Sequence, residues 1–127
     1  MFFKTIVFTA LFIVGLGYGV TYFFKSGEAN RFLDSHHEET WAPEVDYYVG
    51  QYHYIFGHWD SGIFRFTRVI NMYKDMRYAP AAQFYLAKMY DSKDDKFHAL
   101  VEYRKLVEKY PDCEFADIAT KRIEYLR

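Results

Sequence analysis

The amino-acid sequence contains one unit twice, because residues 48–79 align with residues 85–116 when the chain is shifted by 37 positions. Aromatic residues fall opposite aromatic residues, and small residues fall opposite small residues. Representative pairs are Tyr48 and Tyr85, Gly50 and Ala87, His53 and Tyr90, Gly62 and Ala99, and Phe66 and Tyr103. A fixed period of roughly 20–50 residues is typical of proteins that stack one supersecondary unit repeatedly. The repeat therefore favours a binding function over catalysis.

Within each unit, apolar residues recur at steps of three and four, which predicts amphipathic α-helices. We expect helices at about 44–57, 61–75, from Pro80 onward, 95–109 and 114–126. In the first helix, the stripe expected to face the core consists of Val45, Tyr48, Val49, Tyr52, Ile55 and Phe56. The last helix carries charged residues on its outer side, as a terminal cap does. The prediction is an all-α domain of two hairpins plus a capping helix.

This unit resembles the tetratricopeptide repeat (TPR), a helix-turn-helix repeat that stacks into a right-handed solenoid. The residues that carry the resemblance are Gly50 or Ala87, Gly62 or Ala99, Phe66 or Tyr103, and the pair Tyr110-Pro111. The 37-residue spacing and the segment 109–116 are similar to a bacterial periplasmic branch, which includes repeats of the outer-membrane assembly lipoprotein and of the Tol-Pal-associated coordinator. The resemblance covers about residues 45–126. It implies a short TPR-like solenoid of about five helices.

The amino end carries an apolar segment, because residues 5–24 contain no charged side chain and lie between Lys4 and Lys25. As a helix, 20 residues span about 30 Å, the thickness of a bilayer core. We therefore expect a single-pass transmembrane anchor at the N-terminus. Three parts follow from this pattern: an anchor over 1–25, an acidic linker over 26–43, and a TPR-like helical repeat domain over 44–127. Part of the linker, Ala29–His36, could continue as a frayed helix.

A cleaved signal peptide is the alternative, with Thr5–Val14 as its apolar region. We favour a retained anchor, because the apolar run continues past the small residues near position 17 as far as Phe24. The flanking positive charges nearly balance, and we expect the soluble domain on the periplasmic or extracytoplasmic side. Gly15 and Gly19 are four residues apart and share a helix face, which predicts close packing against another transmembrane helix.

Charge is unevenly distributed although the formal net charge is only −1. Residues 26–60 hold seven acidic residues and one basic residue, whereas residues 61–127 hold thirteen basic and ten acidic residues. Either the chain has two solvated faces, or an acidic strip orients it against a basic partner. The small net charge favours no nucleic-acid partner. Arg65 and Arg68 are expected on the solvated side of the second predicted helix.

Six large apolar residues lie off the predicted core stripes, and we interpret them as a partner-binding set. They are Tyr47, Tyr54, Trp59, Phe64, Met72 and Phe84. Interface cores are enriched in such residues, although a loosely packed small core is the alternative. His53 and Tyr90 occupy equivalent positions of the two units and are predicted to line a groove formed by the first helix of each hairpin.

The sequence shows no nucleophile elbow, phosphate-binding glycine loop or metalloprotease motif, so we expect no enzyme activity and no small-molecule substrate. Five histidines are present, and His36-His37-Glu38-Glu39 contains metal-ligating side chains on a linker. His53 and His58 are five apart and are not expected to share a helix face. We predict no catalytic residue, no metal and no cofactor.

Three functions are consistent with these patterns. The favoured one is a membrane-anchored scaffold module that acts as an accessory subunit of a larger membrane complex through protein partners. The first alternative is a periplasmic envelope assembly factor, or chaperone-like TPR protein, that binds client peptides transiently. The second alternative is an electron-transfer subunit that carries a cofactor on its histidines.

Overall fold

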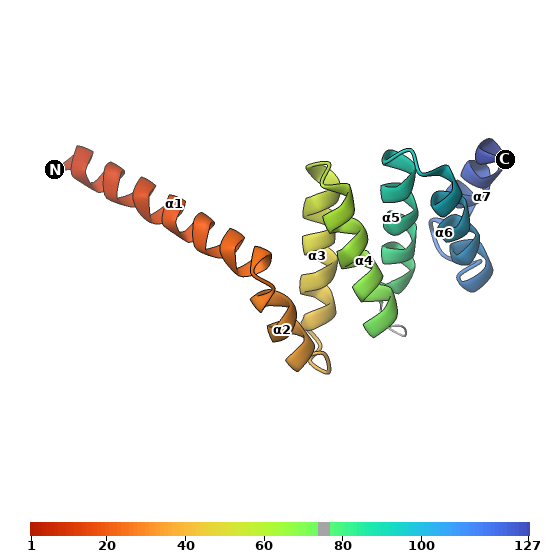
Figure 1. Cartoon of the computed structure of the whole chain (residues 1–127), viewed down its shortest axis with the longest axis horizontal. Coiled ribbons are helices and arrows are strands. Elements are labelled where there is room, and N and C mark those ends of the chain that lie inside the picture. Colours follow the sequence, from red (N-terminus) through yellow and green to blue (C-terminus); the bar gives the residue numbers. More distant parts are fainter. Residues whose placement is uncertain (74–76) are drawn as a thin grey trace. The chain divides into compact units, whose positions relative to one another are not determined.

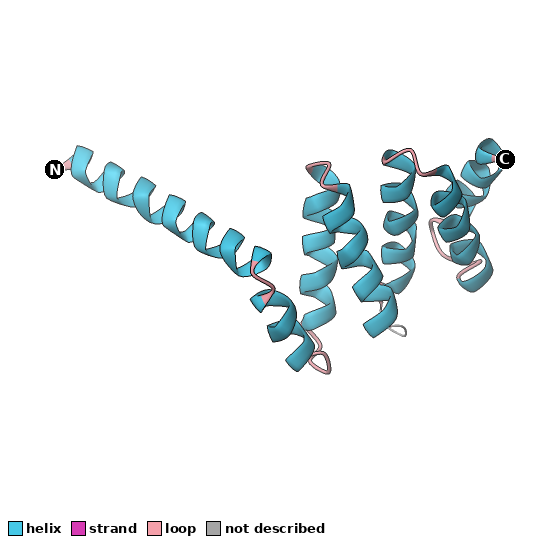
Figure 2. Cartoon of the chain, viewed as in Figure 1, coloured by secondary structure: helices cyan, strands magenta, loops and turns pink. Residues whose placement is uncertain are grey.

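The computed structural model describes residues 1–73 and 77–127, and within these ranges every regular element is an α-helix (Figures 1 and 2). The helices are α1 (Phe2–Lys25), α2 (Glu28–Ser35), α3 (Ala42–Ile55), α4 (Trp59–Met72), α5 (Ala79–Ser92), α6 (Lys96–Lys109) and α7 (Ala116–Leu126). They form two compact units, Met1–Glu38 and Glu39–Arg127. We refer to these as the anchor unit and the repeat unit.

In the anchor unit, α1 is 24 residues long and buries none of its residues. It is long and apolar enough to cross a membrane, a property that signal sequences share. Gly27 turns the chain with a φ of 82°, and α2 follows directly. This helix lies where Ala29–His36 was expected to continue as a frayed helix, so the described chain has seven helices rather than one anchor helix plus about five.

The repeat unit reproduces the 37-residue period in its backbone. The helices α3 and α5 begin and end 37 residues apart, α4 and α6 do the same, and α7 begins 37 residues after α5. The two positions of positive φ in this unit, Gly57 (70°) and Asp94 (65°), are also 37 apart among the described residues. The turn that closes each hairpin is thus the same turn.

The helix bounds differ from the predicted bounds by a few residues. Pro43 and Pro80 each lie in the first turn of a helix, where a missing N–H costs nothing, so α3 and α5 begin just before them. The second predicted helix ends earlier than expected, at Met72, and residues 74 and 75 of that prediction lie outside the described residues. The last predicted helix begins at Ala116, two residues later than expected.

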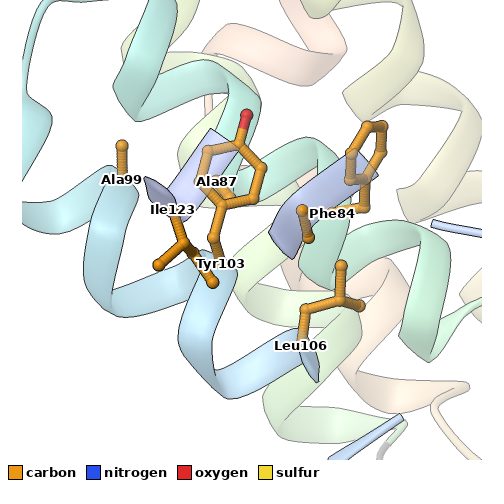
Figure 3. Packing of buried hydrophobic residues seen from close by; sticks show 7 residues of the cluster. Phe84, Ala87, Ala99, Tyr103, Leu106 and Ile123 are labelled. Carbon is orange, nitrogen blue, oxygen red and sulfur yellow. The ribbon is translucent and has the colours of Figure 1, made fainter. Parts of the chain in front are cut away.

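Each helix of the repeat unit packs against the next along the chain, from α3 to α7. The core between α5, α6 and α7 is shown in Figure 3. Its buried members are Phe84, Ala87, Ala99, Tyr103, Leu106, Ala119 and Ile123. Alanines from α5, α6 and α7 contribute to this cluster, which allows the helix axes to approach closely around the larger side chains.

In the first hairpin, glycines occupy the positions of two of those alanines. A Cβ added to Gly50 would lie 2.8 Å from Cε1 of Phe66, and a Cβ added to Gly62 would overlap Cε of Met89. Phe66 and Met89 are both fully buried. The small residues that the sequence pairs at these positions therefore lie at close contacts within the α3–α4 hairpin and between α4 and α5.

Candidate partner-binding surface

Four closely spaced apolar residues on α3 and the turn after it are exposed. Tyr48, Tyr52, Ile55 and Phe56 are 59%, 52%, 73% and 61% exposed. We call these four residues the α3 face. The prediction that they belong to the core stripe of the first helix is wrong. Large apolar residues this exposed and this closely spaced are typical of interaction sites.

The second hairpin explains why this face is open. Tyr85 and Met89 lie 37 positions after Tyr48 and Tyr52, and both are covered by α4. Tyr85 stacks on Phe66 with ring centroids 5.7 Å apart, and Met89 is fully buried. Because α3 is the first helix of the repeat unit, no earlier hairpin of that unit covers its equivalent positions. Tyr48 and Tyr52 therefore lie on the stacking surface of a repeat without its neighbour, whereas Ile55 and Phe56 correspond to Ser92 and Lys93, which are exposed in the second hairpin as well.

Three aromatic residues of the predicted partner-binding set are half-buried instead of fully exposed. Tyr47 lies against Tyr78, with ring centroids 4.9 Å apart, and burial raises the pKa of its phenol. Tyr54 packs edge-on against Tyr85 at 5.2 Å and lies 6.5 Å from Trp59. Apolar periodicity had placed these three residues outside the core, whereas the structure uses them to join α3 to α4 and α5.

Phe84 does have a place in the core, contrary to the sequence prediction. It is only 5% exposed and stacks on Phe115 with ring centroids 4.5 Å apart. The reason is that α5 contacts helices on both of its sides, so its buried surface is wider than one stripe. Phe64 and Met72 on α4, by contrast, are 46% and 38% exposed, as predicted for surface residues.

A buried ion pair joins the two helices of the first hairpin. Asp46 is fully buried, and its Oδ1 accepts a hydrogen bond from Nη1 of Arg65 at 2.9 Å. Nε of Arg68 donates to both carboxylate oxygens at 3.2 Å. Arg65 is 4% exposed, so the expectation that it lies on the solvated side of its helix is wrong. Breaking such a buried pair typically costs about 3–5 kcal/mol.

His53 and His58 lie together at the end of the first hairpin, which the sequence prediction missed. Their Nδ1 atoms are 3.3 Å apart. Burial, and secondarily the charge of His58, lowers the pKa of His53. Tyr90, the equivalent of His53 in the second hairpin, stacks on His98 with ring centroids 5.1 Å apart. The two predicted groove residues thus contact different neighbours.

A pocket of about 420 Å³ lies among α5, α6 and α7, and sequence reasoning did not find it. Its lining includes Phe84, Lys88, Tyr103, Lys121, Arg122 and Tyr125. Nζ of Lys88 lies over the ring of Tyr54 at 5.3 Å, and Arg122 forms two hydrogen bonds with Asp91 at 2.6 and 2.8 Å. The sequence feature that could have indicated this pocket is the occurrence of basic residues close to aromatic residues on α5 and α7.

These surfaces are suited to binding. Within residues 1–73 and 77–127, no group of three or more His, Cys, Asp or Glu side chains is placed to hold a metal ion. The α3 face offers an apolar surface, and the pocket offers cations beside aromatic rings. In the anchor unit, neither Gly15 nor Gly19 has a non-local atom within 4 Å of where a Cβ would lie, so both keep open space for a neighbouring helix.

A comparison with models of known protein families gave no match. A comparison with curated protein sequences also gave no match.

Proposed function

We propose that this chain is a membrane-anchored protein-interaction module that serves as an accessory subunit of a larger membrane complex. The observation that carries the proposal is the open α3 face, because α4 covers Tyr85 and Met89, the equivalents of its members Tyr48 and Tyr52. In this role the protein has no reaction of its own. The anchor holds it in the membrane, and the repeat unit docks onto the partner.

The occupant of the α3 face is a helix of the partner subunit. The internal repeat supports this choice, because the surface that covers Tyr85 and Met89 is itself a helix, α4. That helix presents the small residue Gly62 at the point of closest approach. A partner helix with a small residue facing Tyr52 reproduces the same packing, and helix axes then approach to about 8–10 Å.

Because both proteins are anchored in one membrane, a small docking surface is sufficient for a stable complex. Stable complexes between free proteins bury about 800 Å² on each partner, which is more than four side chains supply. Confinement of both subunits to one membrane makes docking effectively intramolecular and raises the local concentration. In the proposal, Gly15 and Gly19 add a second contact between transmembrane helices, and Phe64 and Met72 extend the docking surface over α4.

We assign the repeat unit to a TPR-like solenoid as part of the proposal. Support comes from the 37-residue period of its helix bounds and from the close helix contacts at Gly50 and Gly62. In such a solenoid the first helix of each hairpin lines the concave side. His53 and Tyr90 are proposed to line that side, and Tyr47, Tyr54 and Trp59 are proposed to contribute to partner binding around α3. The soluble part is proposed to lie on the extracytoplasmic side.

Transient binding of client peptides is the second candidate, and the pocket on α5, α6 and α7 favours it. Lys88, Lys121 and Arg122 surround aromatic rings there, which suits a peptide with acidic and aromatic residues. An accessory subunit co-purifies in a fixed ratio that moderate salt does not change. A client-binding factor gives substoichiometric capture that falls with salt, because exposed charges are screened within about 10 Å at 0.1 M.

Purification of the tagged full chain from native membranes in mild detergent tests the proposal. We expect one or a few membrane proteins in fixed ratio with the chain. The variant Tyr52→Ser with Ile55→Ser should lose them, whereas Phe97→Ser, which alters an equally exposed apolar residue on α6, should keep them. Retention by the double variant would reject the α3 face as the docking surface.

A further inference from the structure

The two histidines at the end of the first hairpin have the spacing of metal ligands. Their Nδ1 atoms are 3.3 Å apart, and their ring centroids are 5.5 Å apart. A zinc–imidazole bond is about 2.0–2.1 Å long, and two such bonds at a tetrahedral angle place their nitrogens about 3.3 Å apart. The separation of the two Nδ1 atoms therefore matches that of two imidazole ligands on one ion.

The backbone of the turn brings the two residues together before any ligand arrives. Gly57, with a φ of 70°, reverses the chain between them. The amide of His58 donates to the carbonyl of His53 at 2.9 Å, and the amide of Gly57 donates to that of Tyr54 at 3.3 Å. This is a glycine-terminated helix end, in which the residue after the left-handed position bonds back to the last turn.

The second hairpin shows that this backbone does not depend on the histidines. There the amide of Asp95 donates to the carbonyl of Tyr90, also at 2.9 Å, and Asp94 has the positive φ. Tyr90 and Asp95 stand where His53 and His58 stand in the first hairpin. The same turn thus carries two imidazoles in the first hairpin and none at the equivalent positions of the second. The backbone conformation of the turn therefore forms with or without the histidines.

We propose that His53 and His58 form a binding site for a divalent transition-metal ion, with Zn²⁺ as the representative ion. Neutral imidazole is a ligand for zinc, copper and nickel. Two protein ligands leave coordination positions open, which water occupies in the isolated chain. A donor from a docked protein can replace that water, because Tyr52 and Phe56 of the α3 face flank the histidines. The site itself rests on the histidine geometry and not on the proposed function.

Without metal, the same distance fits a hydrogen bond between one protonated and one unprotonated Nδ1. This is the competing interpretation, and titration with Zn²⁺ separates the two. The linker histidines His36 and His37 could also capture zinc, because they lie beside Glu38 and Glu39. The measurement therefore uses the full chain, without a histidine tag and with both linker histidines changed to glutamine.

Isothermal titration of this protein with Zn²⁺ in mild detergent should give one ion per chain. His53→Tyr and His58→Asn should each weaken binding by roughly 100-fold, since loss of even a second-shell partner typically costs about 10–100-fold. His98→Asn is the matched control and should change nothing. His53→Tyr introduces the residue of the second hairpin, and circular dichroism checks that the fold is kept.

Nitrogen NMR of the histidine rings gives an independent readout. Addition of Zn²⁺ should shift the Nδ1 resonances of His53 and His58 together and leave His98 unchanged. Absence of zinc binding in the chain without linker histidines would overturn the proposal. Binding that survives both His53→Tyr and His58→Asn would overturn it as well, since the ion would then lie elsewhere.

Discussion

Asp46 and Gln83 occupy equivalent positions in the two hairpins, and each bonds to the residue 19 positions further along the chain. Asp46 accepts from Arg65, whereas Nε2 of Gln83 donates to the carboxylate of Glu102 at 2.6 Å. Lys105 bonds to the same carboxylate at 2.8 Å. The acidic partner has thus moved from the first helix of the hairpin to the second. Both hairpins therefore have a polar contact between the same two positions, but the acceptor lies on the first helix in one hairpin and on the second helix in the other.

Asp46→Ala should be among the most destabilising single changes in the repeat unit. It removes the carboxylate that Arg65 and Arg68 bind within the hairpin, and the expected loss is about 3–5 kcal/mol. Gln83→Ala, the matched change, should cost only about 1–3 kcal/mol. Urea unfolding followed by tryptophan fluorescence measures both, because Trp41 and Trp59 lie in the repeat unit.

Transfer of the second hairpin's bridge into the first should restore much of that loss. In the double variant Asp46→Gln with Arg65→Glu, Arg68 can play the part of Lys105 beside the new carboxylate. We expect the double variant to be more stable than Asp46→Ala. If it is no more stable, the two bridges are not interchangeable.

The two glycines of the first hairpin should respond differently to alanine. At Gly50 the new methyl group meets the buried ring of Phe66, which is rigid, so overpacking should cost about 1–3 kcal/mol. At Gly62 it meets the flexible end of Met89, and the gain in helix propensity of up to about 1 kcal/mol offsets the strain. The same fluorescence measurement ranks the two. An equal loss at both sites would contradict the packing described for Phe66.

The equivalent side chains Met89 and Tyr52 should contribute differently to the free energy of unfolding of the isolated chain. Met89→Ala creates a cavity between α4 and α5 and should cost about 2–5 kcal/mol. Tyr52→Ala at the equivalent position should change the stability by about 0.5 kcal/mol or less, because its side chain is half exposed. A large loss for Tyr52→Ala would mean that the α3 face is already covered within the chain.

Labelling of a single cysteine tests on which side of the membrane the repeat unit lies. Cys113 is half-buried and is the only cysteine, so Cys113→Ser gives a background without thiols. Ser92→Cys in that background places a thiol on an exposed residue at the end of α5. A membrane-impermeant maleimide added to intact cells or spheroplasts should label it. Labelling only after lysis would place the repeat unit in the cytoplasm.

The period of 37 was readable from sequence because paired residues such as Phe66 and Tyr103 fill equivalent places in the packing. The outward direction of Tyr48 and Tyr52 was not readable. Apolar spacing indicates that a helix has a stacking face but not whether a neighbouring hairpin exists to cover it. The first helix of a stack and an internal helix therefore carry the same pattern, and only the structure distinguishes them.

Two further residues escaped prediction for local reasons. Phe84 lies off its expected stripe because α5 packs against helices on two sides. His58 approaches His53 because the positive φ of Gly57 folds the chain back, and helical spacing does not apply across that turn. Phe64 and Met72, which were predicted to lie off the core stripe of their helix, are both exposed.

Photo-crosslinking in native membranes tests the central claim most directly. A benzophenone amino acid at position 52 lies within the α3 face, and the same group at position 104 lies on the exposed side of α6 and serves as the control. We predict one discrete adduct from position 52, to a helix of a membrane protein, and none from position 104. No adduct at position 52, or the same adducts at both positions, would contradict the claim that the stack is completed by a partner helix.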